Sequence, residues 1–207
     1  MECEFLIKGI VIGFSIAAPV GPIGILTIQR SMNHGAWAGF ATGMGAATAD
    51  ALYGCVAGFG LTLISNWLLE IQTPVLLGGG LFLCGLGLST LKQPPPQGQR
   101  GSDPIFKGYL SSYLSTFFLT LTNPMTIMAF MAIFAGLGLS TMTKGYAGAL
   151  SLVTGVFLGS CLWWMILTWG VGQLKPKLDK RFQATINRGA GMVLLVFGFW
   201  ALIRLIP

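Results

Sequence analysis

The sequence predicts an all-α membrane protein with six transmembrane helices, arranged as two inverted three-helix repeats. Three observations lead to this prediction. The composition is too apolar for a water-facing surface, six apolar segments are each long enough to cross a bilayer, and the same order of helix types occurs twice along the chain.

The composition sets the class of protein. Hydrophobic residues make up 54% of the 207 residues and charged residues only 9%, whereas a soluble domain carries roughly 25% charged residues. So few charges cannot cover a water-facing surface, and lipid must cover it instead. The net charge of +6 is not the mark of a nucleic-acid partner, because the basic residues lie in short links between apolar segments.

Six segments reach the length of about 20 mostly apolar residues that a spanning helix needs. They are Phe5–Ile28, Ala38–Leu63, Ile71–Leu91, Tyr109–Leu137, Tyr146–Val171 and Arg188–Ile206. The first begins near Glu2, Glu4 and Lys8 and is longer than the apolar part of a signal peptide, roughly 7–15 residues. We therefore expect it to be a membrane helix rather than a cleaved leader.

One long polar segment, from Lys92 to Lys107, divides the chain nearly in half and contains three consecutive prolines. We expect a first three-helix repeat at residues 1–91, a cytoplasmic linker at 92–107 and a second three-helix repeat at 108–207. Each half has a Pro-broken helix, then a Gly-rich helix, then a helix with two glycines seven residues apart. Three spans is an odd number, so the second repeat must enter the membrane upside down, as in many secondary transporters.

The basic residues predict the orientation. One side of the membrane carries nine of the twelve: Arg30, Lys92, Arg100, Lys107, Lys175, Lys177, Lys180, Arg181 and Arg188. The other side carries only Lys8, Lys144 and Arg204. Cytoplasmic loops hold the excess of Lys and Arg, so we expect the linker in the cytoplasm and both termini outside.

Two helices are predicted to break inside the membrane. A proline removes a backbone N–H and frees the carbonyl four residues earlier. The second half of a broken helix then presents an N-terminus with free N–H groups and a partial positive charge, which suits a carboxylate. We expect a substrate-binding site at these breaks, formed by Pro19, Gly21, Pro22, Thr122, Asn123 and Pro124.

Asp50 is the only acidic residue well inside a predicted span. An ionisable group there costs several kcal/mol and usually faces a cavity or a partner. We expect Asp50 to belong to the substrate site, where it could pair with a substrate ammonium or carry the protons that drive transport. The alternative is a purely structural carboxylic acid, hydrogen-bonded to Thr48 or to a neighbouring helix.

These motifs resemble the LysE/RhtB family of amino-acid exporters. The resemblance rests on Pro19-x-Gly21-Pro22, on Asp50 and on the stretch from Thr122 to Phe130 that contains Asn123-Pro124, and it covers nearly the whole chain. It implies a bacterial inner-membrane transporter, not an enzyme, that exports amino acids or related metabolites and is driven by the proton gradient. Many relatives carry Asn or Asp soon after the Pro-Gly-Pro element, where this chain has Ile23-Gly24-Ile25.

Other functions stay open at this point. An exporter of another small solute or of a metal ion could share the architecture, although this chain offers one His and one intramembrane Asp. A membrane redox protein is less favoured, because Cys3, Cys55, Cys84 and Cys161 form neither a C-x-x-C pair nor a matching pair between halves. We expect no cofactor and no metal site; a homo-oligomer is compatible with the sequence.

Overall fold

Every described segment of this computed structural model is helical apart from short turns. The structure describes residues 2–19, 21–58, 72–92, 105–123, 126–127, 129–130, 145–174 and 180–203. These ranges contain seven helices: α1 (Glu2–Ala17), α2 (Pro22–His34), α3 (Ala36–Gly58), α5 (Gln72–Lys92), α6 (Ile105–Leu121), α8 (Gly145–Leu174) and α9 (Lys180–Ile203). No strand occurs in these ranges, so the predicted all-α class is confirmed.

The first predicted span consists of two helices, α1 and α2, which meet at an angle of 79°. Pro22 is the first residue of α2, a position where its missing N–H costs nothing. The carbonyl of Gly21 then accepts the first hydrogen bond of the new helix, from the N–H of Ile25 at 3.0 Å. The chain therefore changes direction at its Pro-Gly-Pro element.

Helix α2 extends further than the sequence predicts. The predicted span ends at Ile28 and leaves Arg30 and His34 in a polar link, but α2 continues to His34. The chain then turns at Gly35, whose φ of 95° is a conformation that suits glycine. Polar residues are tolerated in α2 because neighbouring helices, rather than lipid, cover its buried face.

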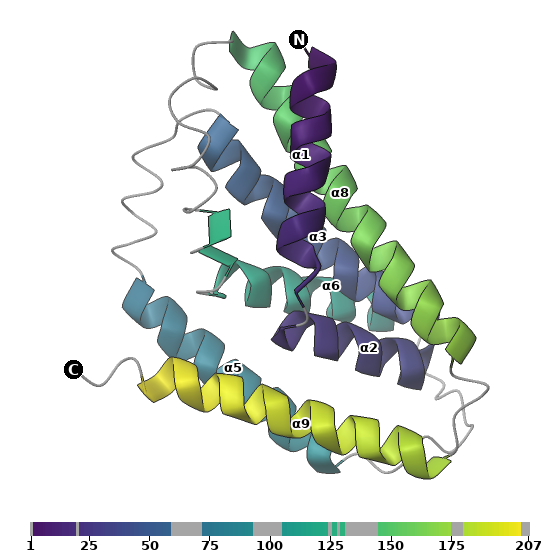
Figure 1. Cartoon of the computed structure of the whole chain (residues 1–207). Coiled ribbons are helices and arrows are strands. Elements are labelled where there is room, and N and C mark those ends of the chain that lie inside the picture. Colours follow the sequence, from purple (N-terminus) through teal and green to yellow (C-terminus); the bar gives the residue numbers. More distant parts are fainter. Residues whose placement is uncertain are drawn as a thin grey trace.

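Helices α1 and α8 run side by side in the same direction (Figure 1). Their facing surfaces carry Gly9 and Gly13 on α1 and Gly155 and Gly159 on α8. A Cβ atom added at any of the four would overlap backbone atoms of the other helix. Small residues of this kind let membrane helices approach closely, so these glycines set the separation of α1 and α8.

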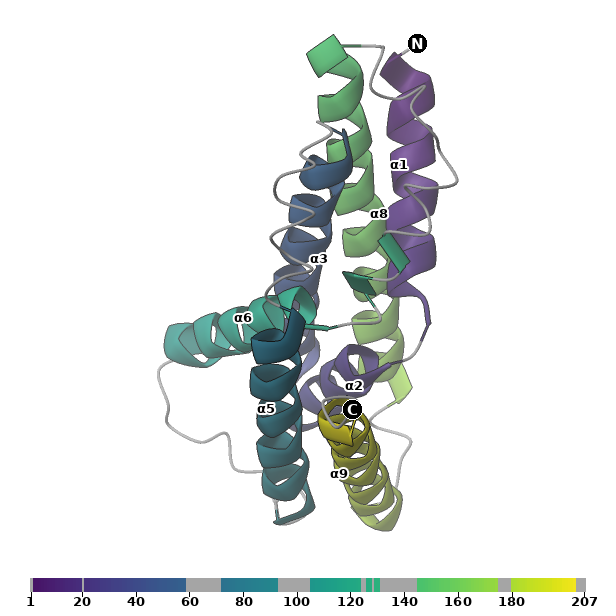
Figure 2. The same ribbon diagram turned by 90° about the vertical axis from the view of Figure 1, so that its left-hand side faces the viewer.

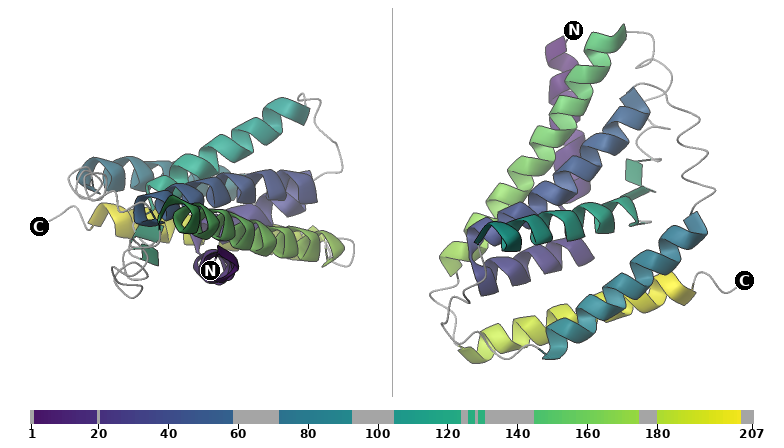
Figure 3. Two further views of the ribbon diagram at one scale, coloured as in Figure 1. Left: turned by 90° about the horizontal axis from the view of Figure 1, so that it is seen from above. Right: turned by 180° about the vertical axis from the view of Figure 1, so that it is seen from behind.

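Helices α5 and α9 form an antiparallel pair, which lies beside the other helices (Figure 3). Gly80 lies against the carbonyl of Gly198, and Gly87 lies against the carbonyl of Gly191. The two glycine pairs with a spacing of seven thus contact each other.

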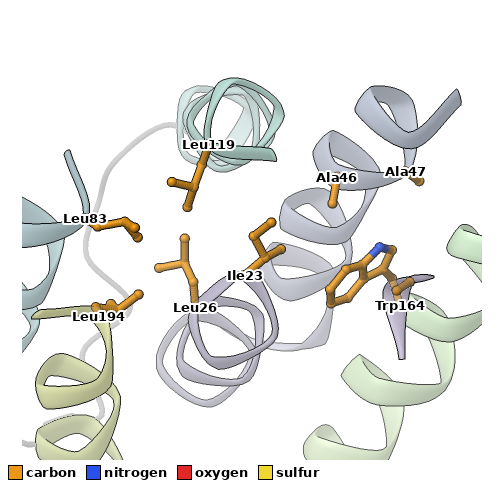
Figure 4. Packing of buried hydrophobic residues seen from close by; sticks show 9 residues of the cluster. Ile23, Leu26, Ala46, Ala47, Leu83, Leu119, Trp164 and Leu194 are labelled. Carbon is orange, nitrogen blue, oxygen red and sulfur yellow. The ribbon is translucent and has the colours of Figure 1, made fainter. Parts of the chain in front are cut away.

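Helices α2 and α6 lie between the α1–α3–α8 group and the α5–α9 pair (Figure 2). The buried cluster that joins these elements is drawn in Figure 4, where Leu26 of α2 points toward Leu83, Leu119 and Leu194 from three other helices. Trp164 of α8 packs into the same cluster. The second half of the first broken helix is thus at the centre of the described structure.

Of the described helices, α8 alone is long and apolar enough to cross a bilayer, and the bent pair α1 and α2 adds a second span if the two are counted together. Shorter apolar stretches are Leu77–Lys92 and Arg188–Trp200. The second and fourth predicted spans run into residues 59–71 and 131–144, which lie outside the described residues. The six spans and the inverted repeats therefore stay predictions.

Aromatic side chains lie near both ends of α8. Trp169 packs edge-on against Trp37 and Phe40 of α3, with ring centroids 5.2 and 5.5 Å away. Near the other end, Tyr146 is 80% exposed. The two positions are separated by about 35 Å at 1.5 Å per residue, close to the hydrocarbon thickness of about 30 Å. This placement is typical of the aromatic belts at the two membrane surfaces.

Candidate functional site

The buried carboxylate of Asp50 lies between α3 and α8 and is 3% exposed. The hydroxyl of Ser160 on α8 donates a hydrogen bond of 2.7 Å to Oδ2 of Asp50. The indole Nε1 of Trp164 in turn donates to the Ser160 oxygen at 3.1 Å. Ser160 is fully buried, and Trp164 is 3% exposed, so the three side chains form a hydrogen-bond chain away from the surface.

The direction of the hydrogen bonds from Trp164 to Asp50 follows from the chemistry of the three side chains. An indole N–H can only donate, so it must use a lone pair of the Ser160 oxygen. The Ser160 hydrogen is then left for the carboxylate of Asp50. The Trp164 side chain reaches this position because Gly43 of α3 has no Cβ to block it. The partner of Asp50 is thus on a neighbouring helix rather than at Thr48, which bonds to Met44 and Tyr113.

Tyr53 connects the Asp50 face of α3 to the end of α6. It lies one turn after Asp50, and its hydroxyl donates a hydrogen bond of 2.7 Å to the carbonyl of Leu121. Its ring stacks on that of Phe130, with the centroids 5.2 Å apart. Cys161, which follows Ser160 on α8, is another titratable group close enough to Asp50 to interact with its charge.

The last carbonyls of α6 are satisfied where the helix ends. The Thr122 hydroxyl and backbone N–H both donate to the carbonyl of Phe118, at 2.9 and 3.0 Å. The N–H of Asn123 donates to the carbonyl of Thr120 at 3.1 Å. With the Tyr53 bond to Leu121, the polar groups that a helix end exposes are largely paired. The helix can therefore end here, inside the protein, without a large energetic cost.

The chain starts a new turn directly after this end. The carbonyl of Asn123 accepts hydrogen bonds from the N–H groups of Thr126 and Ile127, each at 3.1 Å. Asn123 thus has the same position relative to its break that Gly21 has at the start of α2. Pro124, predicted to break this span, lies outside the described residues, so its role in the site stays a prediction.

The two breaks lie close to a common apolar cluster. Ile16 from the last turn of α1 and Leu121 from the end of α6 both pack against the buried core of Tyr53, Phe130 and Val156. This cluster combines side chains from α1, α3, α8 and both sides of the α6 break. The end of each broken helix thus faces the helix that carries Asp50.

The predicted site residues differ in their surroundings. Pro19 is exposed, Gly21 is half-buried and Pro22 is buried at the start of α2. Thr122 is half-buried and its hydroxyl lies next to Gly79 of α5. Asn123 is half-buried as well. Of this set, only Asp50 and Pro22 are thus well buried in the described structure.

Sequence reasoning missed Ser160, Trp164 and Arg30. Ser160 gives no signal of its own in a chain rich in small residues, and only its position opposite Asp50 marks it. The sequence places Arg30 in a polar link, but its guanidinium binds oxygens of α3 and α6. Within the described ranges, no three His, Cys, Asp or Glu side chains gather as a metal ion would require.

Comparisons with known proteins place this chain in a family. The family model of the LysE type translocator matches residues 14–205. The "Putative amino acid efflux protein YcgF" of Bacillus subtilis is 29% identical over 195 residues, which cover 92% of this chain and 91% of that protein. The "Uncharacterized membrane protein YahN" of Escherichia coli is 27% identical over 176 residues, covering 83% and 77%.

No solved structure gives a significant match. The family match nevertheless includes both helix breaks, Asp50 and Ser160. It also accounts for the apolar composition, because a translocator works within a membrane. The chain is therefore a membrane protein that belongs to the LysE type translocator family.

Proposed function

We propose that this protein exports a small amino acid or a closely related metabolite from the cytoplasm in exchange for protons. The solute binds between the two Pro-broken helices and Asp50, and the protein opens alternately to the two sides of the membrane. Support comes from the translocator family and from the name of the Bacillus subtilis relative, which describes amino acid efflux.

The observation that carries this proposal is the buried Asp50 carboxylate and its position at the junction of the helices. It is 3% exposed, and one strong hydrogen bond reaches it from α8. A carboxylate this deep is costly to keep unless it has a function or a complete set of partners. It can form an ion pair with an ammonium group, and it can also carry a proton.

The depth of Asp50 supports a role in coupling. Ser160, its partner, is about 21 Å along α8 from Tyr146 and about 14 Å from Trp169, at 1.5 Å per residue. If those aromatic residues lie at the membrane surfaces, Asp50 lies within the hydrocarbon region. Transporters of this class hold substrate and coupling ions near the bilayer midplane.

The start of α2 supplies the complementary group. The N–H groups of Ile23 and Gly24 lie in its first turn, where a helix has no backbone acceptor for them, and Gly21 provides no side-chain cap. These N–H groups and the positive end of the helix suit a carboxylate. The carboxylate of an amino acid would bind here, with Asn123 as a further donor, and its ammonium would face Asp50.

Contacts between the halves support an inverted repeat. Gly45 and Gly155 are 110 residues apart in the sequence, as are Asp50 and Ser160. A Cβ at Gly45 would overlap the Tyr113 carbonyl of α6, and a Cβ at Gly155 would overlap the Leu6 carbonyl of α1. The contacting pairs Gly80–Gly198 and Gly87–Gly191 would likewise exchange with each other if a two-fold axis related the two halves. Asp50 and Ser160 would then be equivalent positions near the axis.

Export would follow from competition for Asp50. A proton that reaches Asp50 from outside removes its charge and releases the bound ammonium there. Loss of that proton toward the cytoplasm restores the charge for the next solute. Ser160 serves both forms, because a hydroxyl can donate to a carboxylate and accept from a carboxylic acid.

Reconstitution tests this function directly. The purified protein is placed in proteoliposomes loaded with individual radiolabelled amino acids, with and without a pH gradient. We expect efflux of a subset of amino acids that is accelerated by an inward proton gradient. If none of the amino acids left the proteoliposomes, the proposed substrate class would be wrong. If the efflux rate did not change with the pH gradient, proton exchange would be wrong.

A further inference from the structure

Arg30 connects the two broken helices. Its Nη1 donates to Thr42 of α3 at 3.2 Å, and on α6 to the carbonyl of Ser112 at 3.0 Å and to Thr116 at 3.1 Å. Its Nη2 donates to Ser115 at 2.9 Å. One side chain from α2 thus holds four oxygen atoms on two other helices.

The oxygen atoms around Arg30 are oriented for a cation. The hydroxyl of Thr42 donates its own hydrogen to the carbonyl of Ala38. The hydroxyls of Ser115 and Thr116 both donate to the carbonyl of Ser112. Because each hydrogen is already used, the lone pairs of these hydroxyls are left for the guanidinium. The site around Arg30 is therefore built by local bonds within α3 and α6.

The partners of Arg30 are electrically neutral. Within the described residues, the ion pair that the structure contains joins Lys8 and Glu4 on the surface of α1. The guanidinium is half-buried and is held by hydroxyls and a carbonyl. A carboxylate offers Arg two parallel hydrogen bonds to one group of opposite charge, whereas the hydroxyls and the carbonyl around Arg30 carry no charge. An incoming carboxylate can therefore compete with these neutral oxygens for Arg30.

The position of Arg30 places this exchange of its hydrogen-bond partners on the proposed path of the solute. Thr42 lies only about 7.5 Å further along α3 than the exposed Trp37, at 1.5 Å per residue. The α2–α3 turn and the start of α6 belong to the side that the basic residues predict to be cytoplasmic. Counted from Pro22 and Pro124, the position that matches Arg30 in the second half is Ala132, whose methyl group can form no such bonds.

We propose that Arg30 is a carboxylate-binding residue at the cytoplasmic entrance, which also clamps α2 against α6 while no solute is present. The carboxylate of an entering solute takes the guanidinium from its neutral partners and so allows α2 and α6 to separate. This inference rests on the proposed export of a carboxylate-bearing solute. The clamp itself rests only on the contacts of Arg30.

A cysteine in place of Leu119 reports on the clamp. Leu119 lies one turn beyond Thr116 on α6, is 2% exposed and points toward α2 (Figure 4). In a background without the four native cysteines, we would measure the rate at which a small maleimide labels Leu119→Cys in inside-out vesicles. The same rate is measured after Arg30→Gln is combined with Leu119→Cys. The control is Arg188→Gln, which makes the same change of charge on the exposed face of α9.

We expect Arg30→Gln to raise the labelling rate by at least about tenfold, which corresponds to about 1.4 kcal/mol, while Arg188→Gln leaves it unchanged. An equimolar mixture of the standard amino acids, with cysteine left out because its thiol would consume the maleimide, should raise labelling when Arg30 is present. The corresponding amino-acid amides, which lack the carboxylate, should not. In the Arg30→Gln variant, neither mixture should raise the labelling rate of Leu119→Cys further.

Three results would overturn parts of this inference. Equal labelling rates with Arg30 in place and in the Arg30→Gln variant would remove the clamp. An equal response to amino acids and amides, or no response to either, would remove the carboxylate exchange. If Arg30→Gln fails to accumulate, Thr116→Val keeps the charge and removes one acceptor; the same rise in labelling is expected at smaller size, and its absence counts against the clamp.

The labelling experiment needs neither a gradient nor transport, so the two proposals can fail separately. If Arg30→Gln raises the labelling rate but proteoliposomes export no amino acid, the clamp is supported and the proposed function is contradicted. If proteoliposomes show gradient-driven export but Arg30→Gln does not change the labelling rate, the proposed function is supported and the clamp is contradicted.

Discussion

The hydroxyl of Ser160 on α8 holds the carboxylate of Asp50 on α3 through a hydrogen bond of 2.7 Å, and both side chains are buried. The two residues come from different halves of the chain and lie 110 positions apart. The bond therefore joins the halves at the one acidic side chain of α3. Any movement of α3 against α8 has to keep this bond, break it or exchange its proton.

The first prediction concerns the energy of this bond. Ser160→Ala leaves a buried carboxylate without its donor and should lower the stability by about 1.5–3 kcal/mol, the range for hydrogen bonds to charged groups. Thermal unfolding of the detergent-solubilised protein measures the effect. Ser89→Ala, at an exposed position of α5, is the matched control and should change little.

A double-mutant cycle isolates the pair from other effects of each substitution. If Ser160 acts through Asp50, the loss from Ser160→Ala should shrink in an Asp50→Asn background, with a coupling of about 0.5–3 kcal/mol. Additive losses would mean that Ser160 contributes to packing alone.

The second prediction concerns Asp50 in transport. Asp50→Asn keeps the size of the side chain but cannot carry the charge, so it should abolish export driven by a pH gradient while the protein still reaches the membrane in near-normal amounts. Export per molecule in proteoliposomes measures this, with protein amount determined by blotting. Glu4→Gln, which neutralises an exposed carboxylate paired with Lys8, should export normally.

A structural role for Asp50 predicts the reverse pattern. Less Asp50→Asn protein would then be present, but each molecule would export at the normal rate. Wild-type rates per molecule under a gradient would remove Asp50 from the coupling mechanism.

The sequence predicts the helix break at Pro19–Pro22 and the burial of Asp50 because each depends on local chemistry. A proline cannot continue the hydrogen-bond ladder, and a carboxylate inside an apolar helix has to avoid lipid. The direction of α2 after the break is different, since it depends on packing against α3, α8 and α9. No local pattern specifies that angle.

The partners of Asp50 and Arg30 could not be predicted for the same reason. Ser160 and Thr116 are ordinary small polar residues, and only the tertiary fold brings them to their charges. Arg30 looks like a loop residue because polar and small residues surround the end of α2 in sequence. Burial of α2 among other helices makes such a composition compatible with a helix.

The third prediction concerns Asn123, which lies at the second break. Its backbone carbonyl starts the next turn through Thr126 and Ile127, and Asn123→Ala preserves that bond. The variant should therefore fold and insert, yet bind solute more weakly, because one side-chain donor is lost. Half-saturating solute concentrations in proteoliposome efflux test this, with Gln173→Ala on the exposed end of α8 as control. Unchanged efflux would exclude Asn123 from the site.

The fourth prediction concerns the orientation. Single cysteines replace Gln99 in the predicted linker and Thr143 beside Lys144, again in a background without native cysteines. An impermeant maleimide added to intact cells should label Thr143→Cys and spare Gln99→Cys until the membrane is opened. Labelling of Gln99→Cys from outside would invert the predicted orientation without changing the number of spans.

The last prediction concerns the contact between α1 and α8. A Cβ at Gly155 would overlap the carbonyl of Leu6 and lie 2.8 Å from the Cα of Gly9. Both are backbone atoms, so Gly155→Ala can be accommodated only if the helices move apart, at a cost of about 1–3 kcal/mol.

Gly170 is on the same helix but has nothing within 4 Å of its Cβ position. Gly170→Ala should be neutral or slightly stabilising, because Ala favours a helix over Gly by up to about 1 kcal/mol. Thermal unfolding of the two variants side by side measures the difference, and equal stability would mean that α1 and α8 are not in close contact.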